Sequence, residues 1–182
     1  MRTDRFVILT VGKTHSGKTT FAHALEEQLE NSIVIDQDNH AAFVNAHYLK
    51  LRPKEGPNTL KYAVTQAIVD YAVRQTDSHL ILCNSNLDRR GRAELIDYFR
   101  GNAFTSLLVY FDIPEHELQI RVAESQRSKA IFRSAATFED VLARQQSAVA
   151  PEAGESDHFI TIRSSEDVPA VIARIIQRIL KR

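Results

Sequence analysis

One short segment constrains the fold of this chain more than any other feature. Residues 12–19 read GKTHSGKT and match the pattern G-x-x-x-x-G-K-[ST] at every fixed position. An apolar run, Phe6–Val11, precedes the segment, and an amphipathic helical pattern begins near Thr19. In this context the glycines let the backbone curl so that its N–H groups point at phosphate oxygens, at the positive end of the following helix. The sequence therefore predicts a phosphate-binding loop for a nucleoside triphosphate.

Two side chains of the loop have expected roles of their own. Lys18 can reach the β- and γ-phosphates, and the hydroxyl of Thr19 can coordinate Mg²⁺. A dinucleotide-binding loop is excluded, because the sequence contains no G-x-G-x-x-G. The residues expected to contact the nucleotide are Gly12, Lys13, Thr14, His15, Ser16, Gly17, Lys18, Thr19 and Thr20.

Five short apolar runs are separated by helical patterns along the chain. Near-continuous apolar runs, rather than alternating ones, are typical of parallel strands that are covered on both faces. The sequence therefore predicts a three-layer α/β/α P-loop NTPase fold with a mainly parallel five-stranded sheet. The expected strands are Phe6–Val11, Ile33–Ile35, His79–Cys83, Leu107–Phe111 and His158–Ile162.

The helical patterns lie between these runs. In the segment 60–74, Leu60, Val64, Ile68 and Tyr71 form the stripe that we expect to be buried. Pro114 suits the first turn of a helix that runs to about Gln126, with Asp112 as its cap. The other expected helices are 19–29, a helix from about Asn39, 90–99, 138–146 and 167–180.

Length and charge narrow the class of protein. The 182 residues favour a single domain, and 23 basic residues balance 23 acidic ones, which argues against a general binder of long polyanions. Cys83 is the only cysteine, so an internal disulfide framework is excluded, and the seven histidines lack zinc-ligand spacing. We find no targeting signal or membrane-spanning run and expect a cytoplasmic protein without a membrane partner.

Four segments together resemble a known family. They are the phosphate loop, IVIDQD at 33–38, LCNSNL at 82–87 and YFDIP at 110–114. In this order they are similar to the small P-loop kinases related to polynucleotide 5′-kinase, a group close to the zeta-toxin and gluconate-kinase-like enzymes. The resemblance covers roughly residues 6–147, and only the phosphate loop is specific by itself. It implies a kinase that transfers the γ-phosphoryl group of ATP·Mg²⁺ to a hydroxyl of a small acceptor.

The resemblance also implies a carboxylate just after the second strand that orients the acceptor hydroxyl for attack. Asp38 is the best match for this base, and its neighbour Asp36 is the alternative. Asp36 would otherwise support Mg²⁺ beside Thr19. Either carboxylate could instead do no more than cap the helix that follows.

Related kinases carry a lid after the fourth strand whose arginines close on the phosphates. The corresponding stretch here, about 121–138, contains Arg121, Arg127, Lys129 and Arg133. Arg127 is the first candidate for a catalytic arginine, and Arg121 for a nucleotide contact. The alternative is a solvated basic helix face.

Two positions depart from the family pattern on the acceptor side. Polynucleotide kinases have an arginine where this chain has Ala41, and an acid where it has Asn84. A nucleic-acid 5′ end therefore stays among the candidate acceptors, but both departures argue against it. The identity of the acceptor is open; residues 40–57 and 58–71 are expected to line its pocket, but no residue pattern in them names a ligand.

Two other functions compete with a kinase. A P-loop ATPase or GTPase switch is one, although the guanine-specifying N-K-x-D motif is missing. A non-catalytic nucleotide-binding module is the other, with Asn84 as a sign of a decayed site. Arg89, Arg90 and Arg92 form a basic cluster that is expected on a solvated helix face, with contact to a substrate anion as the alternative. Cys83 is expected to be a small core residue.

Overall fold

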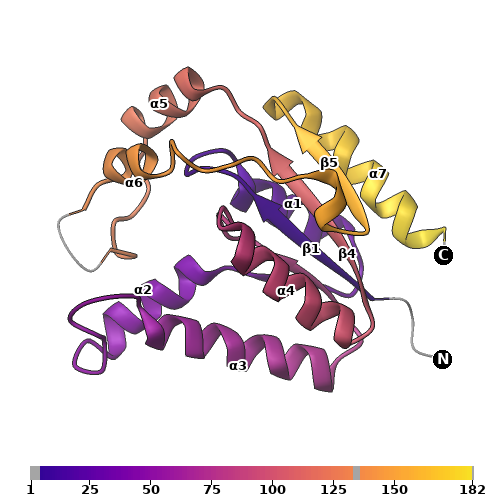
Figure 1. The fold of residues 1–182 in the computed structure, drawn as a ribbon, viewed down its shortest axis with the longest axis horizontal. Coiled ribbons are helices and arrows are strands. Elements are labelled where there is room, and N and C mark those ends of the chain that lie inside the picture. Colours follow the sequence, from indigo (N-terminus) through magenta and orange to yellow (C-terminus); the bar gives the residue numbers. More distant parts are fainter. Residues whose placement is uncertain (1–4, 133–135, 182) are drawn as a thin grey trace.

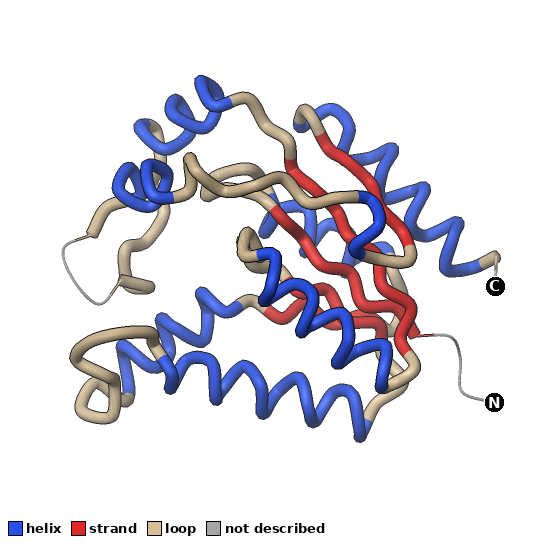
Figure 2. Tube along the Cα trace, viewed as in Figure 1, coloured by secondary structure: helices blue, strands red, loops and turns tan. Residues whose placement is uncertain are grey.

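The computed structural model describes residues 5–132 and 136–181. Its five strands form one parallel sheet in the order β2-β3-β1-β4-β5, which confirms the predicted fold class (Figures 1 and 2). The first strand, β1, lies at the centre of the sheet. The next two strands lie on one side of it, and the last two lie on the other side. The strands are β1 (Arg5–Val11), β2 (Ser32–Ile35), β3 (His79–Leu82), β4 (Phe104–Phe111) and β5 (His158–Ile162).

Helices cover both faces of the sheet (Figure 1). Because side chains alternate along a strand, Phe6 and Ile8 of β1 face one layer while Val7 and Leu9 face the other. The first layer holds α1, α5, α6 and α7, and the second holds α3 and α4. The helices are α1 (Lys18–Gln28), α2 (Gln37–His47), α3 (Thr59–Gln75), α4 (Arg89–Gly101), α5 (Glu115–Ala123), α6 (Phe138–Arg144) and α7 (Val168–Leu180).

The structure corrects the predicted buried stripe of α3. Ile68 and Tyr71 are exposed, at 39% and 68%. The helix instead buries Thr65, Val69, Ala72 and Val73 against the sheet. Both faces of α3 are apolar, so the spacing of apolar residues could not select the face that meets β1 and β3.

The structure also corrects the start and end of α5. Pro114 occupies the cap position and makes no side-chain cap bond, whereas Asp112 accepts a hydrogen bond from the Tyr110 hydroxyl at 3.3 Å. The helix ends at Ala123 rather than near Gln126. Within the described ranges, no helix has the length and apolar character needed to cross a membrane.

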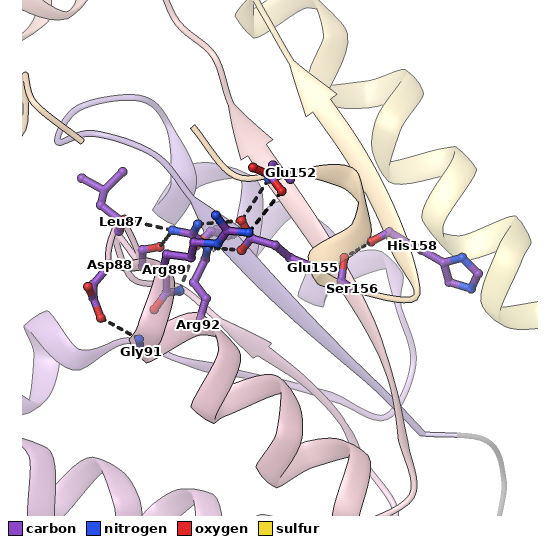
Figure 3. Close-up of polar contacts among 11 residues, drawn as sticks. Leu87, Asp88, Arg89, Gly91, Arg92, Glu152, Glu155, Ser156 and His158 are labelled. Atoms are coloured by element: carbon purple, nitrogen blue, oxygen red, sulfur yellow. Dashed lines mark hydrogen bonds and ion pairs between the residues drawn. The ribbon is translucent and has the colours of Figure 1, made fainter. Parts of the chain in front are cut away.

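A buried ion pair joins the start of α4 to the segment before β5 (Figure 3). The Arg92 side chain is fully buried and donates to both oxygens of Glu155, at 2.6 and 2.9 Å. It also donates to the carbonyls of Asn86 and Leu87, both at 2.9 Å. Arg92 was expected on a solvated face, and that prediction is wrong because Glu155 meets it from 63 residues away. Arg90 does lie in solvent, paired with Glu94.

We expect Arg92→Met to destabilise the fold strongly. The substitution leaves the Glu155 carboxylate without its partner in a site where its side chain is only 11% exposed. Breaking one side of such a pair costs about 3–5 kcal/mol, or roughly 6–20 °C in melting temperature. Thermal unfolding followed by circular dichroism measures the loss, and Arg90→Met is the matched control with no expected change. Equal melting temperatures for the two variants would contradict this account.

The same pair makes an acid-dependent contribution to stability. Its hydrogen bonds from Arg92 lower the pKa of Glu155 in the folded chain. The stabilisation is therefore present above the unfolded-state pKa of a glutamate and is lost as the pH falls through the lower folded-state pKa.

Candidate functional site

A cavity with a volume of about 770 Å³ lies at the carboxyl ends of β1 and β3. In a parallel sheet ligands bind at this edge, where the strand order reverses. Here β1 lies between β3 and β4, so the loop after β1 sits at that reversal. The cavity is lined by residues of the phosphate loop, α2, α3, the segment between α5 and α6, and the turn before α7.

The backbone of the phosphate loop is tightly held. Gly17 has φ +97° and forms the cap of α1, a conformation that suits glycine. At Gly12 a Cβ would lie 2.8 Å from the Cβ of Phe111, so a larger residue does not fit. His15 has φ 60°, a left-handed conformation that is uncommon for a residue with a side chain. Such backbone strain is typical of loops shaped for a ligand.

The Lys18 ammonium folds back into the loop. Its Nζ donates to the Lys13 carbonyl at 2.6 Å and to the Ser16 hydroxyl at 3.1 Å. Desolvation lowers the pKa of Lys18 to about 8, with a further lowering from Arg127. Removing an ammonium from water disfavours its charged form, so the charged state of Lys18 is destabilised in the folded loop.

The other predicted loop residues divide into two groups. Residues 14–20 line the cavity, and the Thr14 N–H donates to the side-chain oxygen of Gln145 at 2.7 Å. Thr19 faces the buried Cys83, whose thiol lies 3.5 Å from the Thr19 hydroxyl. Lys13 points elsewhere, to Glu115 at 2.6 Å, and both Gly12 and Lys13 line a second, smaller pocket.

Cys83 is buried, as predicted for a core residue. Burial raises the pKa of its thiol to about 11, so the sulfur stays protonated at neutral pH and is a poor nucleophile.

Asp36 and Asp38 occupy different surroundings although they are two residues apart. Asp36 is buried and caps α2, since its Oδ1 accepts from the Asp38 N–H at 2.8 Å. The sequence offered both carboxylates as caps, and Asp36 is the one that occupies the cap position. Burial raises the pKa of Asp36. Asp38 instead lines the cavity, where its Oδ2 lies 2.6 Å from a guanidinium nitrogen of Arg127.

Both arginine candidates reach the cavity. Arg127 follows α5 and lies over the Phe138 ring, 5.4 Å from its centroid. Arg121 is on α5 itself and donates to Ser165 at 3.2 Å and to Glu117 at 3.0 Å. Lys129 is exposed, and Arg133 lies outside the described residues.

The segment between α5 and α6 is attached to α2 by a second contact that sequence reasoning missed. The Asn45 amide donates to the carbonyls of Ala130 at 2.7 Å and Phe132 at 3.3 Å. Its oxygen accepts from Arg52 at 3.0 Å. Asn45 follows Asp38 by seven residues, so both side chains lie on one face of α2 and both meet this segment.

Two more residues line the cavity. The sequence indicated Lys61 only as part of the segment 58–71, which was expected to line the acceptor pocket, and it gave Asn84 no role in positioning α2. Lys61 enters the cavity from the first turn of α3. Asn84 accepts from the Gln37 N–H at 3.1 Å and thereby holds the start of α2 against the end of β3. A single polar residue on a helix has no sequence spacing that reveals such a position.

The chain was compared with known proteins. The AAA_33 family model, described as an AAA domain, matches residues 7–151. No curated protein sequence matched the chain.

Among solved structures, Chaetomium thermophilum Kti12 in complex with ADP-AlF3 is 16% identical with a TM-score of 0.65, over 95% of this chain and 98% of that one. Mycobacterium tuberculosis APS kinase CysC in complex with AMPPNP and APS is 14% identical with a TM-score of 0.61, over 98% and 99%. A gluconokinase from Sinorhizobium meliloti is 14% identical with a TM-score of 0.58, over 99% and 98%.

These likenesses show the fold, and the family model covers most of the chain. Together with the phosphate loop at the centre of the sheet, they identify the chain as a member of the AAA_33 family with a P-loop kinase-like nucleotide-binding fold.

Proposed function

We propose that the chain is a kinase that transfers the γ-phosphoryl group of ATP to a hydroxyl of a small acceptor. The observation that carries this proposal is the pairing of Asp38 with Arg127 at 2.6 Å inside the cavity that the phosphate loop lines. Phosphoryl transfer needs positioning and charge neutralisation more than covalent chemistry, and a carboxylate and a guanidinium beside the phosphates supply both.

Each proposed role follows from a position. The N–H groups of residues 14–20 and the Lys18 ammonium would bind the triphosphate, which gives the desolvated lysine an anionic partner. Arg127 would leave Asp38 to neutralise charge on the transferring group. The freed Asp38 carboxylate would then accept the proton of the acceptor hydroxyl.

The site fits Mg²⁺ that is held mainly by the nucleotide. Thr19 offers a hydroxyl at the cavity wall, and the buried Asp36 carboxylate is near enough for its charge to raise the pKa of Lys18. In the described part of the chain, no three acidic, histidine or cysteine side chains come together to hold a metal by themselves. Mg²⁺ commonly keeps waters and binds through one or two protein oxygens plus phosphates, and it would supply charge neutralisation there.

The segment between α5 and α6 would act as a lid over the phosphates. It contacts the loop through Ser125, whose hydroxyl lies 2.8 Å from His15 Nε2, and contacts α2 through Asp38 and Asn45. Closure of such a segment excludes water, which otherwise competes with the acceptor for the phosphoryl group.

We expect Asn45→Ala to loosen this lid. The change removes the two hydrogen bonds from α2 to residues 130 and 132, so residues 124–132 should exchange amide hydrogens about tenfold faster with a non-hydrolysable ATP analogue bound. Hydrogen exchange with mass spectrometry measures this, and Asn39→Ala, an exposed asparagine on the same helix, is the control. Unchanged protection of residues 124–132 in Asn45→Ala would refute the role of Asn45 in holding the lid.

The kinase proposal is tested by a transfer screen. The full chain is incubated with ATP, Mg²⁺ and mixtures of hydroxyl compounds, and ADP release and labelled product are measured. A kinase releases ADP faster with its acceptor and labels it. A P-loop ATPase switch releases ADP equally without any acceptor, and a non-catalytic module binds ATP without releasing ADP; either result contradicts the proposal.

A further inference from the structure

The imidazole of His15 connects the phosphate loop to the lid. It lines the cavity, and its ring meets the Phe138 ring edge-on, with the two centroids 4.8 Å apart. Its backbone is left-handed, at φ 60°, a conformation that costs a residue with a side chain some free energy. The kinase reaction proposed above gives this imidazole no role of its own.

Hydroxyl groups lie at both ring nitrogens of His15. Nδ1 is 2.9 Å from Thr14 Oγ1, and Nε2 is 2.8 Å from Ser125 Oγ. A hydroxyl can donate to a bare ring nitrogen or accept from a ring N–H, so the same two contacts suit the neutral ring and the imidazolium. Ser125 also accepts from the Arg127 N–H at 3.1 Å, and a hydroxyl oxygen can accept a second hydrogen bond. The geometry therefore admits a second proton on His15 without rearrangement.

The charged groups around His15 are mostly cations. They are Lys18 of α1, Arg121 of α5, Arg127 of the lid and Glu139 of α6. Burial lowers the pKa of His15, and the charges of Arg127 and Lys18 lower it further, against the opposing charge of Glu139. The ring is therefore neutral at pH 7 in the ligand-free chain.

A bound triphosphate would reverse this balance. Its negative charges would lie against the Lys18 ammonium and the Arg127 guanidinium, which are the cations that disfavour a proton on His15. An anion close to an imidazole favours the charged ring. The imidazolium then donates from Nε2 to Ser125, and a charge-assisted hydrogen bond is roughly twice as strong as a neutral one.

We propose that His15 is a positioning residue that takes up a proton when a nucleoside triphosphate binds, and whose charged form holds the lid over the phosphates. This inference rests on the kinase function proposed above, in which the loop binds ATP, and adds a regulation of the same site. Nucleotide affinity is then linked to pH. It rises as the pH falls through the pKa that His15 has in the complex, and it levels off once His15 is protonated in the ligand-free chain as well.

Calorimetry measures the proton and needs no turnover. AMPPNP with Mg²⁺ is titrated into the full chain at pH 6.5 in buffers of different ionisation enthalpy, so that the observed enthalpy reports the number of protons taken up. Wild type should take up about half a proton more per nucleotide than His15→Gln. Lys18, with a pKa of about 8 in the ligand-free chain, is charged at this pH before and after binding and adds no proton.

Two comparisons make this measurement specific. His15→Gln keeps a hydrogen-bonding side chain that does not titrate, so it accounts for the protons that the nucleotide itself binds. His116→Gln, an exposed histidine of α5, is the matched control and should take up as many protons as wild type. Equal proton uptake in wild type and His15→Gln would overturn the proposal.

The hold on the lid is measured by the rate at which a fluorescent triphosphate analogue dissociates. Wild type should release it about fivefold more slowly at pH 6 than at pH 7.5, which is the size expected when one hydrogen bond gains a charge. His15→Gln should release it at the same rate at both pH values. An equal rate of release from wild type at the two pH values would contradict the proposal.

His15→Gly separates the side chain from the backbone. Glycine adopts a positive φ without cost, so the variant relieves the backbone while it removes the imidazole. We expect faster release than from wild type at pH 6 and no dependence on pH. Release as slow as from wild type at pH 6 would show that only the backbone matters and would overturn the role of the imidazole.

The inference and the kinase function fail in different ways. Proton uptake that depends on His15, without transfer to any acceptor, would support the inference and contradict the kinase function. Transfer accompanied by equal proton uptake in wild type and His15→Gln would overturn the inference and leave the kinase function standing.

Discussion

Lys18→Ala should lower turnover about a thousandfold or more and weaken ATP binding, with the fold retained. In the proposed reaction the Lys18 ammonium would neutralise charge on the β- and γ-phosphates in the transition state, and such a contribution is typically worth several kcal/mol. Its ammonium donates to Lys13 and Ser16 of the same loop, and among the described residues we find no hydrogen bond from it to another helix or strand, so the fold should tolerate its loss.

The measurements are ADP release and calorimetric ATP binding, with Lys50→Ala, an exposed lysine, as the control. Wild-type ATP affinity and wild-type turnover in Lys18→Ala would end the assignment of the phosphate loop.

The lowered pKa of Lys18 also predicts how the stability of the fold depends on pH. Below pH 8 the lysine is charged in both the folded and the unfolded chain, and desolvation of the charged form costs stability. The unfolded chain binds more protons between about pH 8 and the ordinary lysine pKa, so this cost is relieved as the pH rises through that window. Ligand-free Lys18→Met should therefore melt higher than wild type at pH 7, by a few degrees, with a smaller difference near pH 10.

The strands and the phosphate loop could be predicted from sequence because local chemistry decides them. A run such as Leu107–Phe111 is apolar at every position only where helices cover both faces of the sheet. The loop needs Gly17 at a positive φ and Gly12 against Phe111, so its geometry requires glycine at both positions.

What could not be predicted is decided by parts of the chain that are distant in sequence. Arg92 was grouped with Arg89 and Arg90, and only the position of Glu155 shows which arginine turns inward. Asn45 and Lys61 reach the site because α2 and α3 fold against each other and the lid segment crosses α2. Single polar residues without a periodic partner carry no signal of such an arrangement.

Asp36 and Asp38 are a third case. The sequence limited the candidates for the acceptor-side base to these two carboxylates, and the geometry shows that they occupy different places. The chain turns into α2 at Asp36, so this side chain caps the helix and stays buried, while Asp38 enters the cavity beside Arg127. Alternation of side chains along a strand did not distinguish the two carboxylates. Their positions in the structure predict different effects of substitution, on kcat for Asp38 and on the Mg²⁺ requirement for Asp36.

Asp38→Asn should lower kcat for phosphoryl transfer by roughly a hundredfold or more while ATP binding persists. An amide keeps the size of the carboxylate but cannot accept the proton of the acceptor hydroxyl, and the loss of a general base is usually of this size. The substitution also removes the charge that pairs with Arg127, so the arginine is free to reach the phosphates and nucleotide affinity has no reason to fall. Single-turnover transfer and calorimetric ATP binding measure the two quantities separately.

Asp36→Asn is the matched control, because asparagine caps a helix as well as aspartate does and the start of α2 should be preserved. We expect this variant to raise the Mg²⁺ concentration needed for half-maximal activity, with a much smaller effect on kcat at saturating Mg²⁺. Exchanged phenotypes would exchange the two roles. If neither substitution changes transfer, the site does not work as a kinase, because no other carboxylate among the described residues lines the cavity beside the phosphate loop.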